Sequence, residues 1–135
     1  MMSFPVTIAD HADVYGGRAL VFDGLVDYLD CGSSSTLKTL GNSSFSISTW
    51  INSVLDGSDD YIFSNSTGTD KGILGRVTSA NKFRVLVLTN GSTLDGAESS
   101  ALSSGWNHVA SSWDGSTMRI YINGTEDTTR VNQEL

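Results

Sequence analysis

Two groups of aspartates could supply ligands for a metal ion. Three aspartates fall between Asp23 and Asp30, and three more fall between Asp56 and Asp60. Carboxylate oxygens carried on loops are the ligands that calcium prefers. Neither group has the spacing of a known calcium loop, however, and both Asp23 and Asp56 precede glycine, which is typical of turn-forming aspartates. The sequence therefore favours turns and solvated strand edges over calcium binding in both groups.

Aromatic residues beside carboxylates offer a second kind of chemistry, the binding of sugars. Aromatic rings stack on the apolar faces of pyranose rings, while carboxylate and amide groups bond the sugar hydroxyls. Functional side chains concentrate on loops. This favours tyrosines next to the aspartate-rich loops over the tryptophans, which fall in expected strands at Trp50, Trp106 and Trp113. The predicted ligand-binding residues are Tyr61, Asp59, Asp60, Tyr28 and Asp27.

Residues suited to catalysis are few. Retaining glycoside hydrolysis needs two carboxyl groups about 5 Å apart, and none of the glutamates, Glu98, Glu126 and Glu134, falls in a strand of alternating carboxylates. A serine or cysteine nucleophile needs a neighbouring base. His108 lies in an expected strand, where a core or sheet-face role explains it, and His11 has no partner pattern. The sequence predicts that the protein is not an enzyme.

The composition indicates a single β-rich domain. The chain has 135 residues and is 39% hydrophobic, which is enough to bury a core. Glycine occurs 14 times and proline once, and serine and threonine are abundant, a balance that favours strands and turns over helices. The net charge is −7, and no two of the 8 basic residues are adjacent. This charge argues against nucleic acid as a partner.

The sequence shows no targeting segment. Residues 1–13 lack the basic and apolar regions of a signal peptide. The longest aliphatic run, Val85–Leu88, is too short for membrane insertion, and the lone Cys31 forbids an intrachain disulfide. We expect a protein of a virion or an extracellular surface. Three routes there stay open: export without a signal peptide, a domain of a longer exported protein, or a virion part released by lysis.

Alternating apolar and polar residues predict short strands along most of the chain. In SFSISTWI, residues 44–51, the odd positions are mostly apolar, while the even positions carry serines and Trp50. Residues 82–89, KFRVLVLT, are apolar on both faces, as expected of a central strand. Further strands are expected at Ala19–Phe22, Tyr28–Cys31, Tyr61–Ser64, Ile73–Val77, Trp106–Trp113 and Thr117–Asn123.

Asp-Gly and Asn-Gly pairs separate these strands at the spacing that an antiparallel sheet needs. Trp106–Trp113 and Thr117–Asn123 flank one such pair, Asp114-Gly115, and predict a hairpin. The only helix expected is Ser35–Leu40. So many short strands predict an all-β fold, a two-sheet antiparallel β-sandwich or jelly roll. The remaining pairs are Asp23-Gly24, Asp56-Gly57, Asn90-Gly91, Asp95-Gly96 and Asn123-Gly124.

Three segments resemble the laminin-G-like, concanavalin-A-like jelly rolls, including their pentraxin-related branch. They are ALVFDGLVDYLDCG (Ala19–Gly32), FSISTWI (Phe45–Ile51) and GWNHVASSWDGSTMRIYINGT (Gly105–Thr125). In order, they are similar to the opening strand, the tryptophan-bearing strand and the late hairpin of that family. The resemblance implies a two-sheet antiparallel sandwich over residues 19–135, with residues 1–18 as an N-terminal arm or first strand. It also implies a family whose usual work is to bind glycans or proteins without chemistry.

The pentraxin-related branch suggests one calcium candidate. There, an Asp-Asn pair binds calcium in the loop after the strand that matches YIFSN. The equivalent stretch here, STGTDKGIL, has Asp70 followed by Lys71, so that only Asp70 matches. The resemblance therefore leaves Asp70 as a single candidate ligand, fewer than calcium needs. No other cofactor is expected.

The resemblance also bears on assembly and function. Family members continue past the strand matching YING with several dozen residues that close both sheets, whereas this chain ends at Leu135. Because open sheet edges recruit other chains, we expect another subunit to add a strand there. The function implied is that of a surface-displayed, lectin-like module that recognises glycans or other surface ligands. The alternative is a structural virion component, such as a capsid decoration, fibre or tail protein, that works through assembly contacts.

Overall fold

The computed structural model describes residues 7–8, 13–15, 19–32, 34–40, 43–66, 72–89, 92–127 and 129–130. The chain forms two compact units, residues 1–34 and residues 35–135. In the first unit, β1 (Thr7–Ile8) pairs with β4 (Leu29–Asp30), and β2 (Asp13–Tyr15) pairs with β3 (Ala19–Val21). The domain boundary expected between residues 18 and 19 stays a prediction.

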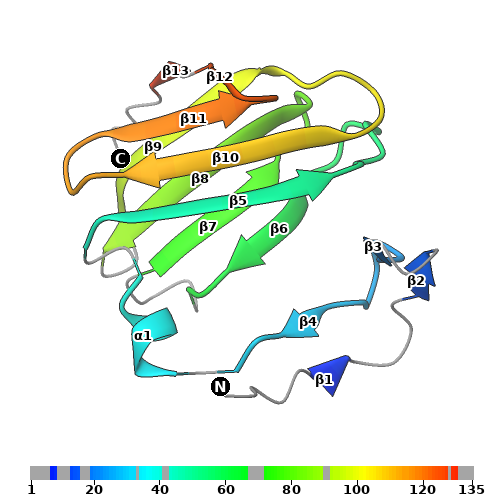
Figure 1. Ribbon diagram of the computed structural model, residues 1–135, viewed down its shortest axis with the longest axis horizontal. Helices are drawn as coiled ribbons and strands as arrows, with labels where there is room; N and C mark the ends of the chain where they lie inside the picture. The colour runs from blue at the N-terminus through cyan, green and yellow to red at the C-terminus, as the bar shows by residue number, and fades with distance from the viewer. Residues whose placement is uncertain are drawn as a thin grey trace. The chain divides into compact units, whose positions relative to one another are not determined.

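The second unit is built from two antiparallel sheets that lie face to face (Figure 1). The four-stranded sheet has, in spatial order, β12 (Thr125–Glu126), β11 (Met118–Ile122), β10 (Asn107–Trp113) and β5 (Phe45–Ile51). The five-stranded sheet has β13 (Thr129–Arg130), β9 (Ser92–Ala101), β8 (Lys82–Thr89), β7 (Gly72–Val77) and β6 (Asp60–Ser64). One short helix, α1 (Ser35–Lys38), precedes β5 in the described part of the chain. The predicted fold class, a two-sheet antiparallel β-sandwich, is confirmed.

The core lies between these two sheets, and β10 shows how a strand contributes to it. Side chains of β10 alternate between buried and half-buried along the whole strand, which is the period-two pattern of a strand with one face in the core. Trp113, at the end of β10, is only 4% exposed. The other core side chains come from both sheets: Ile73, Val77, Phe83, Val85, Val87, Ala97, Leu102, Val109, Met118 and Ile120.

The predicted hairpin around Asp114 is present and joins β10 to β11. Trp113 pairs with Met118, and the two strands stay in register as far as Val109 and Ile122. The Asp114 carboxylate accepts hydrogen bonds from the backbone N–H groups of Ser116 (2.9 Å) and Thr117 (2.8 Å). These bonds lower the pKa of Asp114 to about 2. The Asp-Gly pair therefore fixes the turn through its side chain, as the sequence indicates.

One turn prediction is wrong. Asp95-Gly96 lies inside strand β9, where Gly96 pairs with Leu86 of β8. A Cβ atom at Gly96 would lie 2.5 Å from Cδ2 of Leu86. The glycine therefore leaves room for the Leu86 side chain over the backbone of β9, and the chain does not reverse there.

No helix in the described part of the chain has the length and apolar character needed to cross a membrane.

Candidate functional site

The candidates predicted in the first unit belong to a turn that closes on itself. Asp27 accepts a hydrogen bond from the backbone N–H of Asp23 (2.9 Å), and Asp23 accepts one from the N–H of Asp27 (3.1 Å). Gly24 between them has a φ of 72°, a conformation that favours glycine. Tyr28 is exposed beside this turn. The geometry thus gives Asp27 a structural role and leaves the Tyr28 ring accessible.

The candidates predicted in the second unit gather at the start of β6. Asp59 accepts hydrogen bonds from Arg76 Nη1 (2.7 Å) and from the N–H of Ser79 (2.8 Å). Asp60 accepts one from Ser53 Oγ (3.0 Å). Tyr61 is 61% exposed. Both carboxylates are therefore engaged within the protein, which reduces their freedom to bond a ligand.

The calcium prediction at Asp70 falls outside the described residues. Within the ranges that the structure describes, no three His, Cys, Asp or Glu side chains come together in a way that could hold a metal ion. Calcium binding by Asp70 stays a prediction.

A different surface brings aromatic side chains together, the outer face of β5, β10 and β11. Alternation along β5 turns Ser46, Ser48 and Trp50 away from the core. Pairing then sets Trp50 beside His108 of β10. One row further along the same strands, Ala110 of β10 pairs with Tyr121 of β11. We call this surface the aromatic face and define it by Trp50, Trp106, His108, Tyr121 and the small residues Ser46, Ser48, Ala110 and Ser112.

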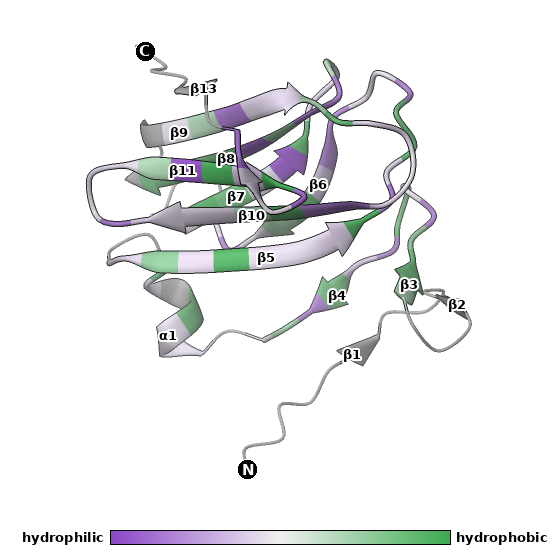
Figure 2. Ribbon diagram, turned by 45° about the horizontal axis from the view of Figure 1, so that its top comes forward, coloured by the Kyte–Doolittle hydropathy of each residue, from purple (hydrophilic) through white to green (hydrophobic). Residues whose placement is uncertain are grey.

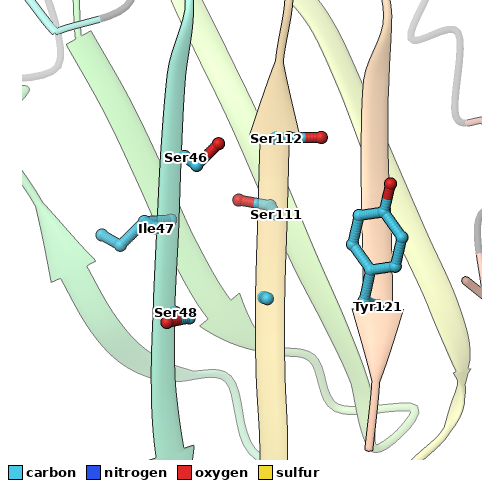
Figure 3. A pocket seen from close by; sticks show the side chains of 7 residues that line it. Ser46, Ile47, Ser48, Ser111, Ser112 and Tyr121 are labelled. Carbon is cyan, nitrogen blue, oxygen red and sulfur yellow. The ribbon is translucent and has the colours of Figure 1, made fainter. Parts of the chain in front are cut away.

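The aromatic face contains a shallow hollow of about 240 Å³. Figure 3 shows Ser46 and Ser48 on one side of this hollow and Tyr121 on the other, with β10 between them. The lining offers hydroxyl groups and one aromatic ring and includes no charged side chain. Its residues are Ser46, Ile47, Ser48, Ala110, Ser111, Ser112 and Tyr121.

Two tryptophans on this part of the sheet are unusually open to solvent. Trp50 is 62% exposed and Trp106, one residue before β10, is 54% exposed. The Trp50 ring lies 5.3 Å from the His108 ring, centroid to centroid, at an interplanar angle of 56°. Large exposed aromatic surface is costly in water and commonly marks a binding site. The tryptophans are therefore functional candidates.

Amide side chains fix the backbone that carries these rings. Asn123 forms two hydrogen bonds with the backbone of His108. Its side-chain Oδ1 accepts from the N–H of His108 (2.9 Å), and its backbone N–H donates to the carbonyl of His108 (2.8 Å). Asn107 is buried and donates from Nδ2 to the carbonyls of Ser103 (2.9 Å) and Gly105 (3.1 Å). These bonds hold the loop before β10. The rings are thus presented on a preorganised surface, which lowers the entropic cost of binding.

On sequence grounds, all three tryptophans are set aside as ligand contacts because they fall in expected strands. The structure separates them: Trp113 packs in the core, whereas Trp50 and Trp106 are on the surface. The alternation of residues between the two strand faces already indicated this. It places Trp50 on the same face as the serines of residues 44–51, and it places Trp106 and His108 on the face opposite to Trp113. Of the two roles expected for His108, in the core or on a sheet face, the structure shows the second.

Charged side chains on the five-stranded sheet form ion pairs that stabilise the fold. Glu98 of β9 is only 8% exposed. Its carboxylate accepts from Lys82 Nζ (2.8 Å) and from Arg84 Nε (2.8 Å) and also pairs with Arg84 Nη2. Burial alone would raise the pKa of Glu98, but the hydrogen bonds and the positive charges of Lys82 and Arg84 hold that pKa below its usual value.

This network predicts a pH dependence of stability. Because the pKa of Glu98 is lower in the folded chain, its contribution is present above about pH 4.5 and is lost as the pH falls through the folded-state value. Replacing Glu98→Gln is expected to lower the free energy of unfolding at pH 7 by about 1–3 kcal/mol. Urea titrations at neutral and acidic pH measure it. If acidification lowered the free energy of unfolding equally in the wild type and in Glu98→Gln, Glu98 would not be the source of the pH dependence.

The comparison with protein families bears on the fold that carries these sites. A family model described as the concanavalin A-like lectin/glucanases superfamily matches residues 21–135. The chain belongs to this superfamily. The lectin-like match covers β5 to β13, including every strand of the aromatic face. Searches of curated proteins and of solved structures returned no match.

Proposed function

We propose that this lectin-like domain binds carbohydrate on its aromatic face and does not hydrolyse it. The observation that carries the proposal is that Trp50, His108 and Tyr121 share one sheet face, whose uncharged, hydroxyl-lined hollow is bordered by Tyr121. Membership in a superfamily of lectins and glucanases supports a carbohydrate ligand. The hollow offers no pair of carboxyl groups of the kind that glycoside hydrolysis uses, which favours binding over catalysis at this site.

The chemistry of the face suits a neutral sugar chain. Exposed rings cover the apolar C–H faces of pyranoses, and serine hydroxyls can donate to or accept from sugar hydroxyls. Tyr121 and Trp50 stand two strands apart, a separation of roughly 10 Å across the sheet. Because one pyranose ring is shorter than this span, a ligand touching both rings must be an oligosaccharide. The uncharged lining favours neutral over acidic sugars.

Replacing Tyr121→Ala tests the proposal. We expect at least a tenfold loss of affinity, since the hollow loses its only ring. Isothermal titration calorimetry with neutral hexasaccharides of glucose, mannose, xylose and N-acetylglucosamine measures it. The matched control is Tyr61→Ala, which removes an equally bulky exposed tyrosine from the other sheet.

The control variant also tests the site predicted from sequence. Loss of binding in Tyr61→Ala with full binding in Tyr121→Ala would transfer the function to Tyr61, Asp59 and Asp60. Absence of binding to every glycan in the panel by the wild-type protein would overturn the proposal. Running the titrations with calcium and with a chelator tests the prediction at Asp70, because our proposed site needs no metal.

We propose display on a virion or an extracellular surface as the setting for this binding. The alternative is a structural component of a virion, and a different feature supports it: among the described strands of the second unit, β5 pairs on one side only. Both proposals are compatible, since a glycan-binding domain can be held in an assembly through its sheet edge.

A further inference from the structure

Charge on the four-stranded sheet is gathered at one side of the aromatic face. β5 and β10 contain no Asp, Glu, Lys or Arg, whereas β11 carries Arg119 and β12 carries Glu126. Figure 2 shows this difference, with β5 in green and pale segments and a purple segment on β11. Among the strands of this sheet, only β11 and β12 can therefore offer an acidic or basic side chain to a ligand on the aromatic face.

Glu126 lies directly beside the tyrosine that borders the hollow. It pairs with Tyr121 in the register of β11 and β12. Directly opposite residues of antiparallel strands turn to the same face, with their Cβ atoms about 5 Å apart. β12 lies next to β11 on the side away from β10 (Figure 1), and the side chain of Glu126 is 53% exposed. The hollow thus has an accessible carboxylate one strand beyond its ring.

Arg119 does not occupy this carboxylate. Its Nη1 donates to Oδ2 of Asp114 at 3.3 Å, whereas its Nε lies 3.9 Å from Oε1 of Glu126, beyond hydrogen-bond distance. Hydrogen bonds in the turn lower the pKa of Asp114 to about 2, so that Asp114 stays ionised at neutral pH. Two carboxylates therefore share one guanidinium, which leaves a negative charge at this side of the aromatic face.

We infer that the aromatic face prefers glycans built from amino sugars. A glucosamine unit stacks on Tyr121, and its protonated 2-amino group pairs with the Glu126 carboxylate. The inference rests on the proposed carbohydrate function of this face and adds a ligand class to it. The amino group of glucosamine is equatorial, so it leaves the edge of the sugar ring sideways, toward a neighbouring strand. An ammonium group donates charge-assisted hydrogen bonds to a carboxylate.

The charge of the whole chain favours the same ligand class. A net charge of −7 attracts a cationic oligosaccharide at long range and raises its rate of association. Acetylation of the amine removes its positive charge, so N-acetylglucosamine loses both this attraction and the pairing with Glu126. Acidic sugars are repelled by the same field. The expected order of affinity is therefore glucosamine, then neutral sugars, then acidic sugars.

Calorimetry with matched hexasaccharides tests the inference. In a mildly acidic buffer that protonates the amines, we expect the glucosamine hexasaccharide to bind wild-type protein about fivefold more tightly than those of glucose and N-acetylglucosamine, the size of one exposed ion pair. Glu126→Gln should remove this preference and leave the affinity for the glucose hexasaccharide unchanged. The matched control is Asp56→Asn, which removes the same charge from an exposed loop between β5 and β6 and should keep the preference.

The outcomes separate this inference from the proposed function. If the neutral hexasaccharides bind and the glucosamine hexasaccharide binds no more tightly, the inference is overturned and the carbohydrate site stands. Equal effects of Glu126→Gln and Asp56→Asn would overturn it in the same way. So would a preference that persists in Tyr121→Ala, because general attraction to an acidic protein does not need the ring. If none of the hexasaccharides binds, the proposed function fails as well.

Carbodiimide coupling gives a second measurement, which locates the bound amine. The carbodiimide activates a carboxylate, the amine of the sugar then attacks the activated carbon, a urea leaves, and an amide bond joins the sugar to the protein. We expect mass spectrometry to find the glucosamine hexasaccharide on Glu126 and much less of it on Asp56. Coupling of equal extent at the two carboxylates, or none at Glu126, would contradict the pairing.

Discussion

Replacing Trp50→Ala is expected to reduce glycan affinity at least tenfold while leaving the free energy of unfolding almost unchanged. The ring is 62% exposed, so folding gains little from it. A bound sugar would cover much of the exposed surface, and burying about 100 Å² of apolar surface contributes about 2.5 kcal/mol. That energy exceeds the 1.4 kcal/mol of a tenfold change in affinity. Calorimetry and urea denaturation measure the two effects separately.

A double variant shows whether one ligand touches both rings. Trp50 and Tyr121 lie on β5 and β11 with β10 between them, so their direct interaction in the free protein is small. If an oligosaccharide spans the face, Trp50→Ala and Tyr121→Ala should each weaken binding and together abolish it. Trp50→Phe should restore part of the affinity. Full affinity in Trp50→Ala would confine the site to the hollow beside Tyr121.

The strands of the sandwich were predictable because their signals are local. Alternation places Lys82–Thr89 as one strand, and the structure has β8 with the same bounds. The helix expected at Ser35–Leu40 is present as α1. The β9 strand was missed because Asp95-Gly96 has the composition of a turn, whereas the structure uses the glycine for contact with Leu86. A close approach between neighbouring strands leaves no separate signal in the sequence.

The candidate site was harder to predict because it depends on which strands become neighbours. Tyr61, Asp59 and Asp60 are adjacent in the sequence, so they are easily recognised as a group. Trp50 and His108 are far apart along the chain and meet only through the register of β5 with β10. The alternation of residues shows on which face of its strand each ring lies, but it does not show which ring of a neighbouring strand lies next to that ring. Long-range pairing therefore carries the information that the sequence pattern lacks.

Replacing Trp113→Ala is expected to have the opposite consequence to Trp50→Ala. Trp113 is 4% exposed and packs among core residues from both sheets. Removing a buried tryptophan leaves a cavity that costs about 3–5 kcal/mol, a large share of the 5–15 kcal/mol typical of a whole domain. We expect a much lower urea midpoint. Any glycan affinity of the remaining folded protein should stay close to wild type, because Trp113 does not line the hollow.

Comparing the two tryptophan variants separates a binding role from a packing role. Both substitutions remove the same side chain from the same four-stranded sheet, and they differ in the face from which it is removed. Trp113→Phe fills most of the cavity and should recover part of the lost stability. Equal losses of stability in Trp50→Ala and Trp113→Ala would mean that Trp50 is covered in the folded protein. The aromatic face would then be a packing surface, and the proposed glycan binding on it would be wrong.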